Sequence, residues 1–106
     1  MDKKILVKEL VPFIAALRAD GLNVTRAELF PAELRGYYTL AISAEWKDLI
    51  GINRHRVLTK KKIELLSRES HNHILNTYTY NSPEAIEAEM HLLTQYQTPV
   101  GEVVYG

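Results

Sequence analysis

Apolar side chains recur at helical spacing near the start of the chain. Those that fall on one side of an α-helix are Leu6, Leu10, Phe13, Ile14 and Leu17. Pro12 interrupts this stripe, so the helix either kinks there or begins near residue 11 with the proline in its first turn. Asp20-Gly21 then predicts the end of the helix, because glycine adopts the left-handed conformation without a steric penalty.

Three later stretches favour β-strands, because they alternate in polarity or are rich in β-branched and aromatic residues. They span residues 22–30, 37–43 and 73–80. The first two are separated by a segment that begins at Pro31 and ends at Gly36, which predicts a hairpin with a longer loop.

Two more helices complete the pattern. Asn53 is the expected N-cap of the first, which places the apolar residues of 57–66 roughly on one side and the three lysines at 60–62 in solvent. The second begins at Ser82-Pro83-Glu84, a hydroxyl cap followed by a proline and an anion in the first turn. It stops at Thr98-Pro99, and residues 100–106 form either a short edge strand or a tail.

The predicted order is therefore α-β-β-α-β-α. Three helices that pack on one face of a three-stranded sheet would bury these apolar stripes in an α+β fold. The chain of 106 residues has the length of a single domain, so one domain over residues 1–106 is expected.

Composition narrows the class of protein. Apolar residues make up 46% of the chain, which is typical of a folded domain. The absence of cysteine excludes disulfides, thiolate zinc sites and a cysteine nucleophile. No apolar run approaches the roughly 20 residues that cross a bilayer, and no signal peptide is apparent at the start. We expect a soluble cytoplasmic protein that does not bind membranes.

The neutral total, 13 basic against 13 acidic residues, hides an uneven distribution. Residues 47–69 carry seven basic and three acidic side chains, whereas residues 70–106 carry four glutamates and no lysine or arginine. A basic segment can attract phosphates and an acidic one a basic partner, but both are also typical of solvated helix faces.

Enzymatic chemistry finds little support in the sequence. It contains no nucleophile elbow, no phosphate-binding glycine loop and no paired-histidine zinc motif. His71 and His73 are of more interest, because two residues apart on an extended segment they would point to the same side and could both ligate a metal. The alternative is that they are ordinary polar residues at a strand end.

A cationic group, Arg54-His55-Arg56, opens the second predicted helix. With Lys60 and Lys61 it could contact a partner or a nucleic-acid backbone. The alternative is an intramolecular bridge to the glutamates at positions 84, 87 and 89.

Aromatic residues are concentrated in the predicted strands. Tyr37, Tyr38, Tyr78 and Tyr80 either stack on bases or, as is more common, form cross-strand pairs under a helix layer. Trp46 is expected to anchor the core.

Several of these segments together resemble the BolA family. The residues that carry the likeness are Tyr38 to Ser43, Trp46, Leu49, Arg54-His55-Arg56-Val57-Leu58, His73-Ile74-Leu75, Thr77, Thr79 and Ser82-Pro83-Glu84. The family's comparable elements are a strand that ends in serine, an Arg-His-Arg helix start, a strand that opens with histidine, and a Thr-Pro-Glu helix start. The likeness covers residues 38–86, and the predicted element order is similar to that of the class II KH arrangement.

The resemblance implies a non-enzymatic adaptor that acts with a monothiol glutaredoxin in iron–sulfur cluster handling or regulation. No cofactor would be tightly bound by the chain alone, and a [2Fe–2S] cluster would be shared with the partner. His73 matches the family's strand histidine ligand. The loop that often supplies the other ligand in the family, here residues 30–36, has no His or Cys, so His71 would have to substitute. His73 and the rim formed by Arg54, His55 and Arg56 are expected to project from neighbouring parts of the scaffold.

Two alternatives remain open. One is a nucleic-acid-binding module of the transcription-regulator type, which would use Arg54, His55, Arg56, Lys60 and Lys61. The other is a self-associating structural subunit, such as a homodimer, joined through an edge strand or through residues 100–105.

Overall fold

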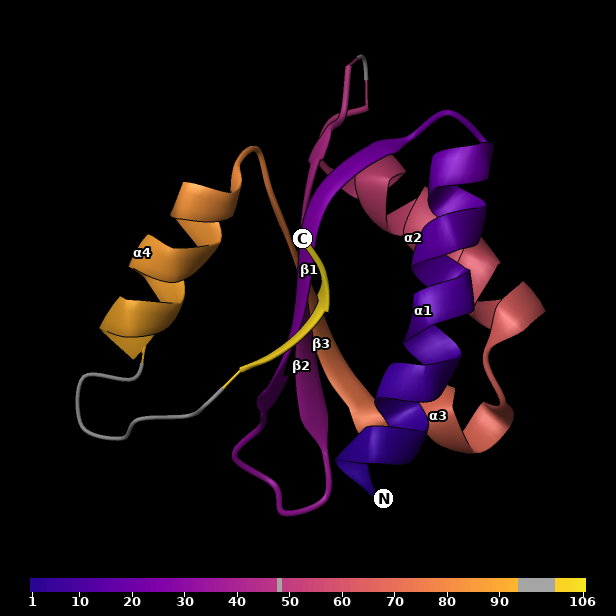
Figure 1. Ribbon diagram of the computed structural model, residues 1–106, viewed down its shortest axis with the longest axis vertical. Helices are drawn as coiled ribbons and strands as arrows, with labels where there is room; N and C mark the ends of the chain where they lie inside the picture. Colours follow the sequence, from indigo (N-terminus) through magenta and orange to yellow (C-terminus); the bar gives the residue numbers. More distant parts are fainter. Residues whose placement is uncertain (48, 94–100) are drawn as a thin grey trace.

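The computed structural model describes residues 1–47, 49–93 and 101–106, with the backbone alone for residues 91–93 (Figure 1). The elements follow the order α1 (Lys3–Ala19), β1 (Asn23–Pro31), β2 (Tyr38–Glu45), α2 (Ile52–Leu65), α3 (Arg68–His73), β3 (Ile74–Tyr80), α4 (Pro83–Leu93) and β4 (Glu102–Tyr105). The predicted α+β class is confirmed, and the predicted end of α4 at Thr98-Pro99 lies outside the described residues.

The sheet has four strands in the order β3-β2-β1-β4, so the expectation of three strands was wrong. β1 and β2 form the predicted hairpin and pair antiparallel from Asn23 opposite Glu45 to Pro31 opposite Tyr38. β3 joins β2 in parallel after a crossover through α2 and α3. The fourth strand, β4, pairs antiparallel with β1, so residues 102–105 form an edge strand and not a tail.

The larger core lies between the sheet and the layer formed by α1 and α2. The whole predicted stripe of α1 is buried there, from Leu6 to Leu17. It packs with Leu40 and Ile42 of β2 and with Leu58 of α2. Trp46 closes one end of this core, where its indole Nε1 donates a hydrogen bond of 2.7 Å to the carbonyl of Tyr80, so the prediction of a core anchor is confirmed.

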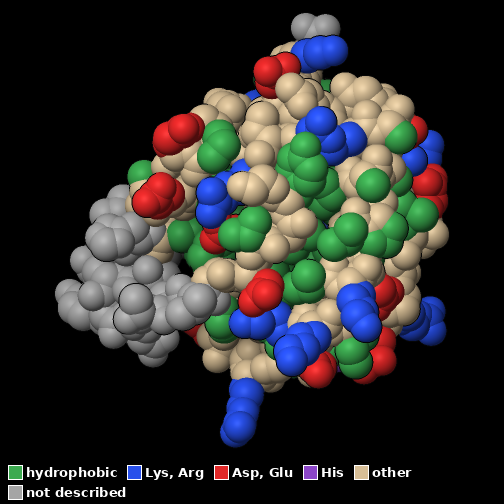
Figure 2. Space-filling model, viewed as in Figure 1, with side chains coloured by type: hydrophobic (Ala, Val, Ile, Leu, Met, Phe, Trp, Pro, Cys, Tyr) green, Lys and Arg blue, Asp and Glu red, His purple; other side chains and the backbone are tan. Residues whose placement is uncertain are grey.

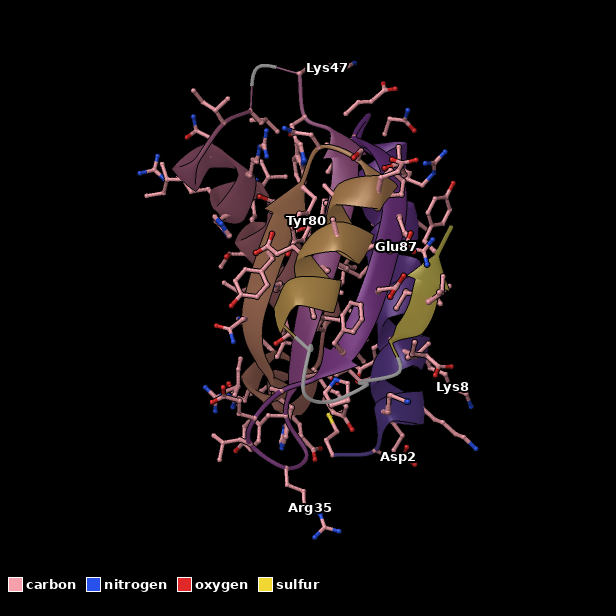
Figure 3. All side chains as sticks on the ribbon, turned by 90° about the vertical axis from the view of Figure 1, so that its left-hand side faces the viewer. Asp2, Lys8, Arg35, Lys47, Tyr80 and Glu87 are labelled. Carbon is pink, nitrogen blue, oxygen red and sulfur yellow. The ribbon has the colours of Figure 1, made fainter. Side chains whose placement is uncertain are left out.

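α4 lies on the opposite face of the sheet, as Figures 1 and 3 show, so the expectation that all helices share one face was wrong. Its buried residues Ile86 and Met90 pack on Phe30, Ala41 and Tyr80. Both faces of the central strands therefore carry apolar residues, and a single helix layer would leave the second face in water.

The structure decides between the two alternatives for the start of α1 and corrects the start of α2. α1 begins at Lys3 and runs through Pro12, which rules out a start near residue 11. The proline is tolerated because it lies on the exposed side, where water can reach the carbonyl of Lys8 that loses its helical partner. α2 begins at Ile52 with Gly51 as its N-cap rather than Asn53, because the positive φ of 53° at this position suits a glycine.

Gly101 lets β4 approach the sheet closely. A Cβ atom at this position would lie 2.5 Å from both Phe30 Cε1 and Glu28 Oε2. Because real Cβ atoms do not come this close to other heavy atoms, any larger residue would force the side chains of Phe30 and Glu28 to shift.

Lys62 is buried, with 7% of its surface exposed, although the sequence predicted an exposed lysine run. Its Nζ donates a hydrogen bond to Thr77 Oγ1 on β3, and no carboxylate among the described residues lies within ion-pair distance. Burial lowers the pKa of this ammonium from 10.5 to about 8.

No helix in the described part of the chain is both long enough and apolar enough to cross a membrane.

We expect the substitution Lys62→Met to stabilise the protein near neutral pH. A pKa that falls from 10.5 to about 8 corresponds to roughly 3 kcal/mol of unfavourable interaction with the charged form, and methionine fills the same space without a charge. We therefore expect a gain of about 1–3 kcal/mol in the free energy of unfolding, measured by urea denaturation.

The pH dependence provides the control for this prediction. Between about pH 8 and pH 10 the unfolded chain binds more protons at Lys62 than the folded chain, so wild-type stability rises with pH in this window. The Lys62→Met variant should lack this rise. A variant that is less stable than wild type at neutral pH would show that the ammonium contributes net stabilisation.

Candidate functional site

The two histidines of the predicted metal pair lie on a helix and not on a strand. α3 begins after Ser67, whose Oγ accepts a hydrogen bond of 3.1 Å from the backbone N–H of Ser70, and it ends at His73. Residues two apart on an α-helix are separated by about 200° around its axis. His71 and His73 therefore point in different directions, and the prediction that they share one side was wrong.

His73 is held in a defined orientation. Its ring stacks on Tyr37 with a centroid distance of 4.7 Å and an interplanar angle of 24°. Its Nδ1 lies 2.7 Å from the carbonyl oxygen of Glu69, which can only accept a hydrogen bond. In the neutral ring the proton therefore resides on Nδ1, which leaves the lone pair of Nε2 available to a ligand.

Glu9 of α1 fixes the start of α3. Its carboxylate accepts hydrogen bonds from the Ser67 backbone N–H at 2.8 Å, from the Ser67 hydroxyl at 3.2 Å, and from the buried Ser70 hydroxyl. Partial burial opposes ionisation of Glu9, but these hydrogen bonds outweigh it and lower the pKa of the carboxyl. The short helix that carries His73 is thus tied to α1 across almost sixty residues of sequence.

Arg54 makes several contacts within the fold. Its Nε donates to the Leu49 carbonyl and its Nη2 to Asn81 Oδ1, both at 2.9 Å. The guanidinium also lies 4.9 Å from the centre of the Trp46 ring. The predicted bridge from Arg54 or Arg56 to the glutamates of α4 does not occur within the described residues.

The other basic residues of α2 divide into two groups. Lys61 Nζ pairs with Asp20 at 2.5 Å and with Glu64 at 3.7 Å, and the hydrogen bond to Asp20 raises its pKa. His55, Arg56 and Lys60 are exposed on the outer side of the helix and make no described side-chain contact. Figure 2 shows basic, acidic and apolar side chains interspersed on the face that it presents, with no continuous basic patch there.

The structure separates His73 from Arg54. His73 immediately precedes β3, whereas Arg54 is bound to Asn81, which immediately follows it. A strand of seven residues spans roughly 23 Å at about 3.3 Å per residue. The expectation that both project from neighbouring parts of the scaffold was therefore wrong, because β3 places them at its two ends.

The four tyrosines have four different environments. Tyr37 stacks on His73, and the Tyr38 hydroxyl donates to the Met1 carbonyl at 2.9 Å. Tyr80 is buried under α4, where burial and the nearby Glu89 raise the pKa of its phenol. Only Tyr78 is exposed. A base-stacking platform formed by the four rings together is therefore not present.

A cavity of about 410 Å³ lies between the end of α1 and the end of β2. Sequence reasoning did not predict it. Its apolar lining residues are Leu17, Leu22, Trp46, Leu49 and Val57. Its other described lining residues are Asp20, Gly21, Glu45 and Lys47. The described lining is thus mainly apolar and suits an apolar group.

No group of three or more His, Asp or Glu side chains that could hold a metal ion converges within the described residues.

Comparison with protein-family models, with curated proteins and with solved structures finds no match.

We expect Glu9→Gln to loosen α3 and to reduce stability near neutral pH by about 1–2 kcal/mol, since hydrogen bonds to a charged acceptor are replaced by weaker ones. Because the folded pKa of Glu9 lies below the ordinary value of 4.5, its contribution is present above that value and is lost as the pH falls through the folded pKa. Urea unfolding at neutral and acid pH measures the difference.

Glu33→Gln, in an exposed loop, is the matched control and should change neither the free energy of unfolding nor its dependence on pH. Hydrogen exchange of the α3 amides should accelerate in Glu9→Gln alone. Equal exchange in both variants would contradict the role assigned to Glu9.

Proposed function

We propose that this chain is a non-enzymatic adaptor that binds a protein partner at the end of the molecule where α3 meets the β1–β2 loop. His73 would donate one imidazole ligand to a metal centre whose remaining ligands come from the partner. The observation that carries the proposal is the fixed orientation of His73, with Nδ1 on a backbone carbonyl and the ring on Tyr37. Metal-ligating histidines characteristically donate their second ring N–H to such an acceptor.

The surroundings of His73 fit a protein partner better than a small molecule. The adjacent loop between β1 and β2 presents Leu34, which is 59% exposed, and Tyr37 is half-buried beside it. An apolar side chain, an aromatic ring and an oriented imidazole at one end of the molecule are the kinds of group that protein interfaces bury.

The resemblance to the BolA family supports a specific partner, a monothiol glutaredoxin, and a specific centre, a shared [2Fe–2S] cluster. Such a cluster takes four protein ligands, and the described residues at this end fit one of them. A bound cluster would supply redox-active iron at the interface, while His73 would hold one coordination position and Tyr37 would keep its ring in place.

We assign no catalytic role to these residues. The Glu9 carboxylate accepts hydrogen bonds from Ser67 and Ser70, and the hydrogen bond of His73 is to a backbone carbonyl. Within the described residues, no imidazole therefore lies in hydrogen-bond contact with a hydroxyl or a carboxylate in the manner of an activated nucleophile.

The test is to mix the protein with a monothiol glutaredoxin and a reconstituted cluster. We expect a heterodimer whose visible absorption and circular dichroism change in His73→Ala, because an imidazole ligand is lost. His71→Ala is the matched control and should keep the wild-type spectrum, since that side chain points elsewhere. The absence of a wild-type complex, or identical spectra for all three proteins, would reject the proposal.

Nucleic-acid binding through α2 is the second candidate function. It is favoured by the exposed His55, Arg56 and Lys60, which remain free to contact phosphates. It is weakened because Arg54, Lys61 and Lys62 of the same helix are occupied within the fold. The surface available to a nucleic acid is therefore smaller than the sequence predicted.

If this function holds, Lys60→Glu should weaken binding across sequences and reduce the slope of log affinity against log salt by about 1. Lys61→Glu should weaken it less, because Lys61 already pairs with Asp20. A filter-binding titration at several salt concentrations measures both effects. Binding that is absent, or independent of salt, would reject this function.

A further inference from the structure

The two margins of the sheet differ in how they are protected. β4 forms one margin and has only four residues. Glu102 on this strand pairs with Lys3 Nζ at 3.4 Å, and the Arg18 guanidinium lies 4.7 Å from the centre of the Tyr105 ring. A short strand with a charged residue and contacts to a helix is a typical means of preventing pairing with another chain.

β3 forms the other margin and lacks such protection. All seven of its residues, Ile74–Tyr80, are uncharged, and none is proline. Among the described residues no strand pairs with its outer side, and Figure 3 shows it along one margin of the sheet with β4 along the other. Leu75 and Tyr78 are 43% and 39% exposed. Long, uncharged edge strands of this kind are templates for strand addition.

We propose that β3 pairs antiparallel with β3 of a second copy of this chain, so that the two sheets join into one across a two-fold axis. Antiparallel pairing of a strand with itself is the isologous arrangement that closes after two copies. The strand suits its own copy because its uncharged side chains bring no like charges opposite one another. The Thr and Tyr residues that predominate in it are also favoured in cross-strand pairs.

Lys62 does not obstruct this margin. It approaches Thr77 from α2, on the face of the sheet that carries Leu40, which lies opposite Thr77 in the β2–β3 register. Its small exposed fraction shows that the ammonium lies beneath the helix layer and not beside the outer backbone groups of β3.

This inference is independent of the function proposed for His73. It also narrows the self-association hypothesis, because residues 102–105 pair with β1 of their own chain and are not a free tail. Of the two edge strands, β4 is the protected one, so β3 is the strand that we expect to pair with a second copy.

Light scattering coupled to size exclusion, over a wide range of concentrations, tests the proposal. We expect wild type to reach twice the monomer mass as concentration rises. Tyr78→Lys should remain a monomer, because two lysines near the axis would repel each other. Val103→Lys places the same charge on the exposed β4 margin and should dimerise as wild type does. Circular dichroism checks that both variants are folded.

Amide hydrogen exchange gives the second measurement. Protection of residues 74–80 should increase with concentration in wild type and in Val103→Lys, but not in Tyr78→Lys. A wild-type monomer at every concentration would overturn the proposal. A dimer that persists in Tyr78→Lys, or one that is lost in Val103→Lys, would also overturn it, because the contact would then lie elsewhere. A series of ever larger species would overturn it too, because an isologous dimer stops at two copies.

Discussion

The burial of β2 on both faces is the constraint on which the rest of the structure depends. Every residue from 39 to 44 is buried, with alternate side chains directed to the two helix layers. Leu40 and Ile42 enter the core under α1 and α2, and Ala41 lies under α4. Ser43 is the buried polar exception, and its hydroxyl is satisfied by Thr25 Oγ1 at 2.7 Å. A strand without an exposed side requires a three-layer arrangement, and this places α4 opposite the other helices.

Much of the local structure follows from the sequence. The stripe of α1 and the β1–β2 hairpin are where the pattern predicts them, and the Ser82 hydroxyl caps α4 by accepting from the Ala85 N–H at 3.2 Å. The side of the sheet that α4 covers could not be derived, because an apolar stripe shows that a helix is buried and does not show against which face. α3 was missed because its six residues, Arg68–His73, carry no apolar periodicity.

For the site residues too, the sequence predicted what depends on neighbouring residues and missed what depends on contacts between distant parts of the chain. The sequence singled out His73 as a candidate, but it did not predict the helix that separates His73 from His71, whose start contacts Glu9 far away in the chain. The contacts of Arg54 with Asn81 and the Trp46 ring could not be predicted from the sequence, because these residues lie close only in the folded state. Lys62, by contrast, could have been recognised, since it lies four residues from both Leu58 and Leu66 on the buried side of α2.

The parallel pairing of β2 with β3 has a consequence for how the chain is synthesised. The first forty-five residues contain α1, β1 and β2, so these elements leave the ribosome first. β3 arrives only after the crossover, and α4 only after β3. Until residues 83–93 have left the ribosome, Phe30 and Ala41 have no helix over them. The nascent domain therefore passes through a stage in which helices cover one face of the sheet and the apolar residues of the other face are exposed. Exposed apolar surface of this kind is what chaperones bind.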